Sequence, residues 1–78
     1  MHSKIEIFGW YGTVAIISAY FANSFGYLDA GSLIYQLLNL TGALGIVAIS
    51  LSKKVYQPMV INIIWAIIAV FALIKILF

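Results

Sequence analysis

Three long apolar segments, separated by two short polar breaks, dominate the hydrophobic pattern of the chain. They run from about residue 5 to 22, from 32 to 51 and from 59 to 78. Each holds roughly 18–20 residues, and a helix of that length, rising ~1.5 Å per residue, spans a hydrocarbon core of ~30 Å. None shows the alternation of apolar and polar residues that is typical of a barrel strand. The pattern predicts an all-α integral membrane protein with three transmembrane helices.

The two breaks carry the residues that end and begin helices. The first contains turn formers and one acid, Asp29, and the second begins with Lys53 and Lys54 and ends with Pro58. Proline suits the start of a helix because its missing N–H has no partner to lose there, so we expect Pro58 to start the third helix. Either Ser32 or Asp29 can cap the second helix, and the sequence does not choose between them.

Composition excludes a soluble domain. Hydrophobic residues make up 65% of the 78 residues and charged residues 8%, against about 25% charged in ordinary globular proteins. A water-facing surface cannot be built from so few polar side chains, so we expect residues 1–78 to form a single membrane domain. Four Lys without any Arg are too sparse for a phosphate-binding stripe, and nucleic acid is not an expected partner.

The lysines predict the orientation of the three spans. Lys4, Lys53 and Lys54 lie on one side of the membrane if there are three spans, and only Lys75 lies near the other side. The positive-inside rule then places the N-terminus in the cytoplasm and the C-terminus outside.

The few polar and small residues inside the segments gather on particular helix faces. At ~100° per residue, Gly9, Gly12 and Tyr20 share one face of the first helix, and Asn62 and Trp65 share one face of the third. The second helix has two such faces, roughly opposite each other. These faces carry Gln36 and Asn39 on one side and Thr41, Gly45 and Ala48 on the other.

Small residues and interhelical hydrogen bonds are what hold helices together in lipid. We therefore expect Gly9, Gly12, Gly42 and Gly45 to serve helix packing. Three helices give little interior for the polar side chains, so we also expect a homo-oligomer, most simply a dimer, or docking on a larger membrane complex. The set Gln36, Asn39, Asn62, Trp65 and Tyr20 has two interpretations, which are polar contacts between helices and contacts to a ligand.

Covalent chemistry is not expected from this sequence. It has no cysteine, no Ser–His–acid set, no pair of carboxylates, no metal-binding cluster and no glycine-rich phosphate loop after a strand. We therefore predict no enzyme, no cofactor and no metal. Glu6, in the first turn of a helix, complements the helix dipole, and Lys75 is placed to extend its ammonium toward the membrane surface.

Segments in all three spans resemble an uncharacterised family of small bacterial three-span membrane proteins, the "CBU-like" domain. The resemblance rests on residues 7–12 and 19–20, on 35–43 with its Tyr-Gln-x-x-Asn sequence, and on 57–65 with its Asn-x-x-Trp sequence. It covers nearly the whole chain and implies the three-span topology and a bacterial cytoplasmic membrane. It implies no catalytic or binding residue.

The architecture is also similar to that of half-transporters, three-span proteins that dimerise around a central path. Half-transporters for sugars carry a Pro-Gln motif inside the first span, whereas the single proline here follows Gln57 at the start of the third. Two functions are therefore expected in competition. One is a facilitator for a small polar or neutral solute, and the other is an accessory subunit that docks through its small-residue faces.

Overall fold

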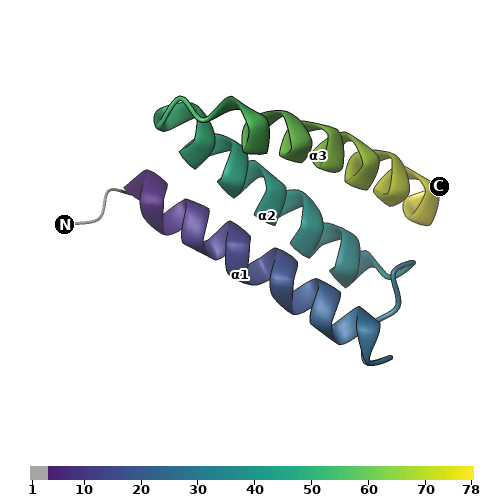
Figure 1. The fold of residues 1–78 in the computed structure, drawn as a ribbon. Helices are drawn as coiled ribbons and strands as arrows, with labels where there is room; N and C mark the ends of the chain where they lie inside the picture. Colours follow the sequence, from purple (N-terminus) through teal and green to yellow (C-terminus); the bar gives the residue numbers. More distant parts are fainter. Residues whose placement is uncertain (1–3) are drawn as a thin grey trace.

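The computed structural model describes residues 4–78 as three helices in sequence (Figure 1). Helix α1 spans Lys4–Ser24, α2 spans Leu33–Ser52 and α3 spans Tyr56–Leu77. All three are long and apolar enough to cross a membrane. The expected all-helical architecture is thus confirmed, and the helix ends lie within three residues of the predicted ends.

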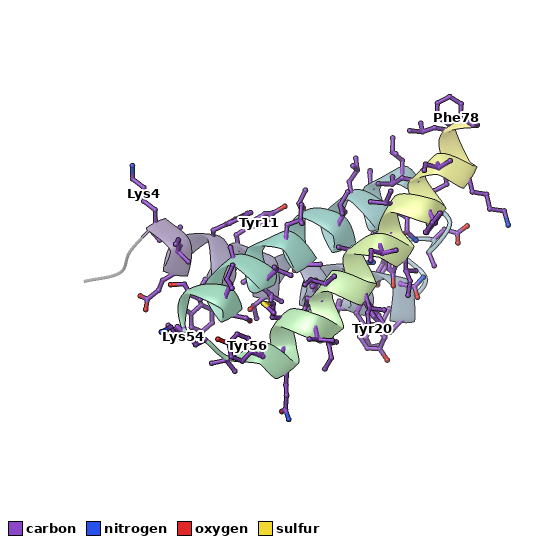
Figure 2. The ribbon with its side chains drawn as sticks, turned by 90° about the horizontal axis from the view of Figure 1, so that it is seen from above. Lys4, Tyr11, Tyr20, Lys54, Tyr56 and Phe78 are labelled. Atoms are coloured by element: carbon purple, nitrogen blue, oxygen red, sulfur yellow. The ribbon has the colours of Figure 1, made fainter. Side chains whose placement is uncertain are left out.

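Helix α2 lies between the other two (Figure 1). It packs against both α1 and α3, whereas no Cα atom of α1 lies within 8 Å of α3. The start of α1 meets the α2–α3 turn at one end of the molecule, and Phe78 lies at the other (Figure 2). The first of these ends carries Lys4, Lys53 and Lys54 and is called the lysine end below.

The first loop settles which residue caps α2. The Ser32 hydroxyl accepts a hydrogen bond from the Tyr35 backbone N–H at 3.2 Å, so Ser32 is the N-cap. The Asp29 carboxylate instead accepts the Gly31 N–H at 3.1 Å within the loop. Both side chains are suited to capping, and the fold decides between them by starting α2 at Leu33, directly after Ser32.

Helices α1 and α2 end in the same hydrogen-bonded motif. After α1, Gly26 adopts a positive φ of 79° while the N–H of Tyr27 bonds to the Ala22 carbonyl at 2.8 Å. After α2, Lys54 adopts φ 57° while the N–H of Val55 bonds to the Ser50 carbonyl at 2.9 Å. This is the Schellman arrangement, which glycine enters without strain and a side chain such as that of Lys54 does not.

Helix α3 begins earlier than predicted. It starts at Tyr56 after the extended residue Val55, so Pro58 is its third residue rather than its first. The position is still compatible with proline, because the first four N–H groups of a helix have no intrahelical partner.

Burial follows the size of the side chain rather than its hydrophobicity. Among residues 4–78 no large side chain is fully buried, while residues such as Phe71 and Ile17 are more than half exposed. The buried helical positions, with a single exception, are glycine, alanine or serine. They are Gly9, Gly12, Ala15, Ala19, Asn39, Gly42, Ala43, Gly45, Ser50, Ala66 and Ala69. This is the reverse of a water-soluble core, in which the large aliphatic side chains lie inside.

Four glycines bring α1 and α2 into backbone contact. A Cβ added at Gly45 would lie 2.5 Å from the Phe8 carbonyl oxygen, and one added at Gly12 would overlap the Gly42 carbonyl oxygen. At Gly9 the added Cβ would lie 2.7 Å from the Ile49 side chain. No other residue fits these positions without a shift, and we call this contact the glycine seam.

The second buried row of α2 lies to one side of the seam. At ~100° per residue, Asn39, Ala43 and Ser50 are centred about 100° around the helix from Gly42 and Gly45. Since α3 contacts only α2 among the described helices, its buried alanines pack on α2 as well. The contact with α1 at Gly45 lies on one of the two faces of α2 that the sequence predicts, and Asn39 lies on the other. A groove remains between α1 and α3.

Candidate functional site

The groove on α2 collects residues from all three helices. It encloses about 340 Å³ and is open on one side. The residues that line it are Ile16 and Tyr20 of α1, Tyr35, Asn39 and Ile46 of α2, and Ile61, Asn62 and Trp65 of α3. None of these side chains carries a charge, so the groove offers apolar walls with neutral hydrogen-bonding groups.

Asn39 is the central polar residue of the groove. Its residue surface is only 6% exposed, and its amide makes no hydrogen bond within the part of the chain that the structure describes. No fully buried side-chain nitrogen or oxygen lacks a partner among those residues. The Asn39 amide atoms therefore keep accessible surface, and that surface lies in the groove. An amide held in an apolar setting without a partner costs free energy until something hydrogen-bonds to it.

Among the described residues, the Asn62 amide makes a hydrogen bond through its nitrogen but not through its oxygen. Its Nδ2 donates to the Pro58 carbonyl one turn earlier on α3, at 2.8 Å. Its Oδ1 is left as an acceptor for the groove, because an amide oxygen has two lone pairs of its own. The indole N–H of Trp65, one turn further along α3, has no partner among the described residues. Asn62 and Trp65 thus present an acceptor and a donor side by side.

The polar groups are spread along the groove rather than gathered at one level. Counted at about 1.5 Å per residue from the lysine end, Asn62 lies about 9 Å, Trp65 about 14 Å and Asn39 about 20 Å along the helices. Tyr20 and Tyr35 follow at about 24–26 Å. Along the helix axis, the steps from Asn62 to Trp65, to Asn39 and to the tyrosines are therefore about 4–6 Å each.

Gln36 is the predicted site residue that the structure does not bring into the groove. Its Nε2 donates to the Ala30 carbonyl at 2.9 Å, which ties the first loop to the start of α2. It lines a separate pocket beside Ala72 and Lys75 of α3. Gln36 lies three residues before Asn39, and the nearby loop carbonyl determines its partner, which sequence spacing does not show.

The sequence did not predict the hydrogen bond that joins Tyr11 of α1 to Thr41 of α2. The hydroxyl of Thr41 donates to the Leu37 carbonyl at 2.8 Å, so the Tyr11 hydroxyl, 2.6 Å away, donates to Thr41 Oγ1. Tyr11 and Tyr20 leave α1 on opposite sides of the molecule (Figure 2), and neither Tyr11 nor Thr41 lines the groove. The sequence did place Thr41 on a small face of α2, but it gave no sign of the partner.

The four glycines predicted to serve packing, Gly9, Gly12, Gly42 and Gly45, all lie in the glycine seam. Their place matters for the groove, because the seam fixes α1 against one side of α2. The hydroxyl of Thr13 adds a local bond to the Gly9 carbonyl at 3.2 Å. Seam and groove are thus formed by different faces of the same two helices.

Comparison with known proteins gives one match. A family model matches residues 5–78, which is nearly the whole chain. No curated protein and no solved structure matches it.

Proposed function

The chain belongs to this small, uncharacterised family, and we propose that it is an integral membrane protein whose groove, closed by a second copy, lets a small uncharged solute cross the bilayer. The single observation that carries the proposal is the Asn39 amide, which is buried and unpartnered in a groove on α2.

Membrane insertion is supported by the distribution of side chains. Aliphatic and aromatic residues cover the outside of the three helices, and within those helices only small residues and Asn39 are buried. Lipid tails are as apolar as Leu, so large side chains gain little by leaving lipid, whereas small residues allow close helix contact. In water the same surface would be an aggregation hazard.

A second copy is proposed because one chain leaves the groove open. The groove's mouth lies between α1 and α3, whose Cα atoms come no closer than 8 Å to one another. In a bilayer this mouth would expose the Asn39 and Asn62 amides to lipid, where an unpaired polar group costs several kcal/mol. Two copies with their grooves face to face would replace lipid by a polar-lined path.

The spacing of the polar groups favours passage over simple glue between helices. Hydrogen bonds that only hold helices together need one or two amides at one level, whereas the groups in the groove follow one another in steps of about 4–6 Å along the helix axis. An uncharged solute can exchange one hydrogen-bond partner for the next over such steps. The absence of charge among the lining residues favours a facilitator over an ion-coupled pump.

An accessory subunit is the competing function, and the structure supplies one argument against its simplest form. The glycine faces that would dock on a larger complex are occupied within the chain, since each of the four glycines packs against the neighbouring helix. Catalysis is not part of the proposal, and the residues that line the groove include no Ser, Thr, Cys, His, Lys or carboxylate.

Liposome flux tests the proposal. The purified chain is reconstituted, and the efflux of a panel of small neutral solutes is compared with that from empty vesicles. We expect flux for at least one solute, and Asn39→Leu should lower it at least tenfold while Leu44→Ala, on the exposed face of α2, keeps it within twofold. No flux above empty vesicles for any solute would contradict the proposal.

Cross-linking tests the second copy. The chain has no native cysteine, so single-cysteine variants are clean probes. Tyr20→Cys at the groove should form a disulfide-linked dimer in membranes. Phe71→Cys, which is about 120° around α3 from Trp65, should not. A strictly monomeric protein in native mass spectrometry from mild detergent would refute the dimer.

The proposed orientation keeps the lysine end in the cytoplasm. In intact cells a membrane-impermeant maleimide should label Tyr27→Cys in the first loop and leave Lys54→Cys unlabelled until the membrane is opened. Both residues are exposed. The opposite labelling pattern would invert the topology.

A further inference from the structure

A second pocket lies at the lysine end, away from the groove. It encloses about 400 Å³ between the start of α1 and the end of α2. It is lined by Glu6, Gly9, Trp10, Thr13, Ile49 and Lys53. It shares no lining residue with the groove, so the proposed solute path does not explain it. We call it the end pocket.

Both signs of charge meet at the mouth of the end pocket. Lys53 Nζ lies 3.2 Å from Glu6 Oε1, and the two side chains are 57% and 28% exposed. Lys4 and Lys54 lie at the same end of the molecule (Figure 2) but do not line the pocket. A purely anionic ligand would meet the Glu6 carboxylate beside Lys53, and a purely cationic one would meet Lys53. The charges fit a ligand that itself carries both signs.

The groups are layered with depth. Counted along α1 at about 1.5 Å per residue, Glu6 lies about 3 Å from the helix start, Trp10 about 9 Å and Thr13 about 14 Å. Ile49, three residues before the end of α2, lies only about 5 Å from the same end, beside Gly9. The pocket thus has an ion pair and an apolar wall near its mouth, and an indole and a hydroxyl deeper in. A phospholipid at a membrane surface carries its charged headgroup outside its ester carbonyls, so the ion pair would meet the headgroup and the indole the ester region.

Trp10 and Thr13 have groups available for such a ligand. The Trp10 ring is 65% exposed, and its indole N–H has no partner within the described part of the chain. The Thr13 hydroxyl donates to the Gly9 carbonyl, so its oxygen lone pairs are open to a donor. An indole face attracts an ammonium group, and its N–H is a donor for a carbonyl oxygen.

We propose that the end pocket binds a phospholipid whose headgroup carries both a phosphate and a primary ammonium group. Lys53 pairs with the phosphate. The ammonium joins the Glu6 carboxylate and lies against the Trp10 ring, and the Trp10 N–H donates to an ester carbonyl of the lipid. This inference rests on the proposed insertion in a membrane, but not on solute passage.

Native mass spectrometry of the full chain tests the lipid site. The protein is purified in mild detergent and offered equal amounts of phosphatidylethanolamine and phosphatidylglycerol. We expect the wild type to retain phosphatidylethanolamine in preference. Lys53→Gln and Trp10→Leu should each lower its occupancy at least fivefold. The matched control Lys54→Gln removes the neighbouring lysine, which does not line the pocket, and should stay within twofold of the wild type.

Two results would overturn the assignment. One is equal or greater retention of phosphatidylglycerol by the wild type, and the other is the same loss in Lys54→Gln as in Lys53→Gln. Circular dichroism shows whether each variant keeps its helices, and Trp10→Leu leaves the ion pair intact if Lys53→Gln does not fold. Alkaline carbonate extraction separates the two proposals. A chain that is extracted is not inserted, whereas an inserted chain without lipid preference lacks only this site.

Discussion

The two sides of α2 are held in different ways. Toward α1, glycines bring backbone against backbone, Tyr11 donates to Thr41, and Glu6 pairs with Lys53 at the end. Toward α3, the described residues include no side-chain hydrogen bond or ion pair that joins the helices, and the polar Asn39 has no partner. The first contact is complete within the chain, and the second leaves groups that something else must satisfy.

This difference indicates which part of the molecule is scaffold and which part is site. The seam fixes α1 and α2 as a rigid pair, because backbones in contact have no side-chain freedom to absorb a shift. Helix α3 packs through Ala66 and Ala69 and is the most apolar of the three helices. The groove lies between α3 and the pair formed by α1 and α2. Its width therefore depends on the contact between α2 and α3, which is the weaker of the two helix contacts.

Enlarging a seam residue should give the largest effect on stability. In Gly45→Ala the new Cβ would lie 2.5 Å from the Phe8 carbonyl oxygen, so the helices must separate, at a cost of about 1–3 kcal/mol. Unfolding in mixed micelles of increasing SDS content measures it. The control is Gly31→Ala in the first loop, whose Cβ would meet nothing closer than 3.9 Å. Equal stabilities of the two variants would mean that the seam is not a close contact.

Asn39→Leu should separate stability from function. Replacing an unpartnered buried amide by an apolar group of similar size is neutral or stabilising, by up to about 1 kcal/mol for the single chain. The same change should abolish solute flux. A loss of more than about 1 kcal/mol in the SDS titration would instead show that the amide has a partner within the chain, and the contrast between the two sides of α2 would fail.

Removing the Tyr11 hydroxyl should weaken the seam side by a smaller amount. Tyr11→Phe loses one interhelical hydrogen bond of 2.6 Å, worth about 0.6 kcal/mol on average in membrane proteins. A double-mutant cycle with Thr41→Val should return a coupling of that size. Tyr27→Phe, in the first loop and 82% exposed, provides the baseline. A coupling of zero would mean that the hydrogen bond between Tyr11 and Thr41 does not stabilise the contact between α1 and α2.

The turn before α3 offers an effect of similar size to that of the Tyr11 hydroxyl, and it is a gain in stability. Lys54 adopts φ 57° in the motif that Gly26 completes after α1, and a non-glycine residue is strained there. Lys54→Gly should therefore stabilise the protein by about 0.5–1 kcal/mol. Lys54→Ala keeps the strain and removes the charge, so it should not. If both variants gained equally, relief of charge repulsion with Lys53 would be the cause.

The local features were largely predictable. Continuous apolar runs gave three helices, because a backbone in lipid must satisfy its hydrogen bonds within the segment, and the structure has them with ends shifted by three residues at most. The sequence did not decide the N-cap of α2, since the side chains of Ser32 and Asp29 can both accept a hydrogen bond from the first turn of a helix. The early start of α3 before Pro58 was missed for a similar reason, because proline is allowed throughout the first turn.

The partners of the polar groups were not predictable. Gln36 and Asn39 share a helix face, yet one bonds to a loop carbonyl and the other has no partner among the described residues. Thr41 lies on the α1 side and takes the Tyr11 hydroxyl. Helical spacing places residues on a face, but a partner depends on which neighbour reaches that face.

By itself, the sequence of this protein determined three helices, the small residues that let them approach, and the amides that need partners. Each follows from the chemistry of one residue type in an apolar setting. Only the tertiary structure decided that α1 packs on Gly42 and Gly45 of α2 and leaves Asn39 in a groove lined by all three helices. That arrangement depends on which residues of α1 meet the glycines of α2, a choice made by the fit of two surfaces.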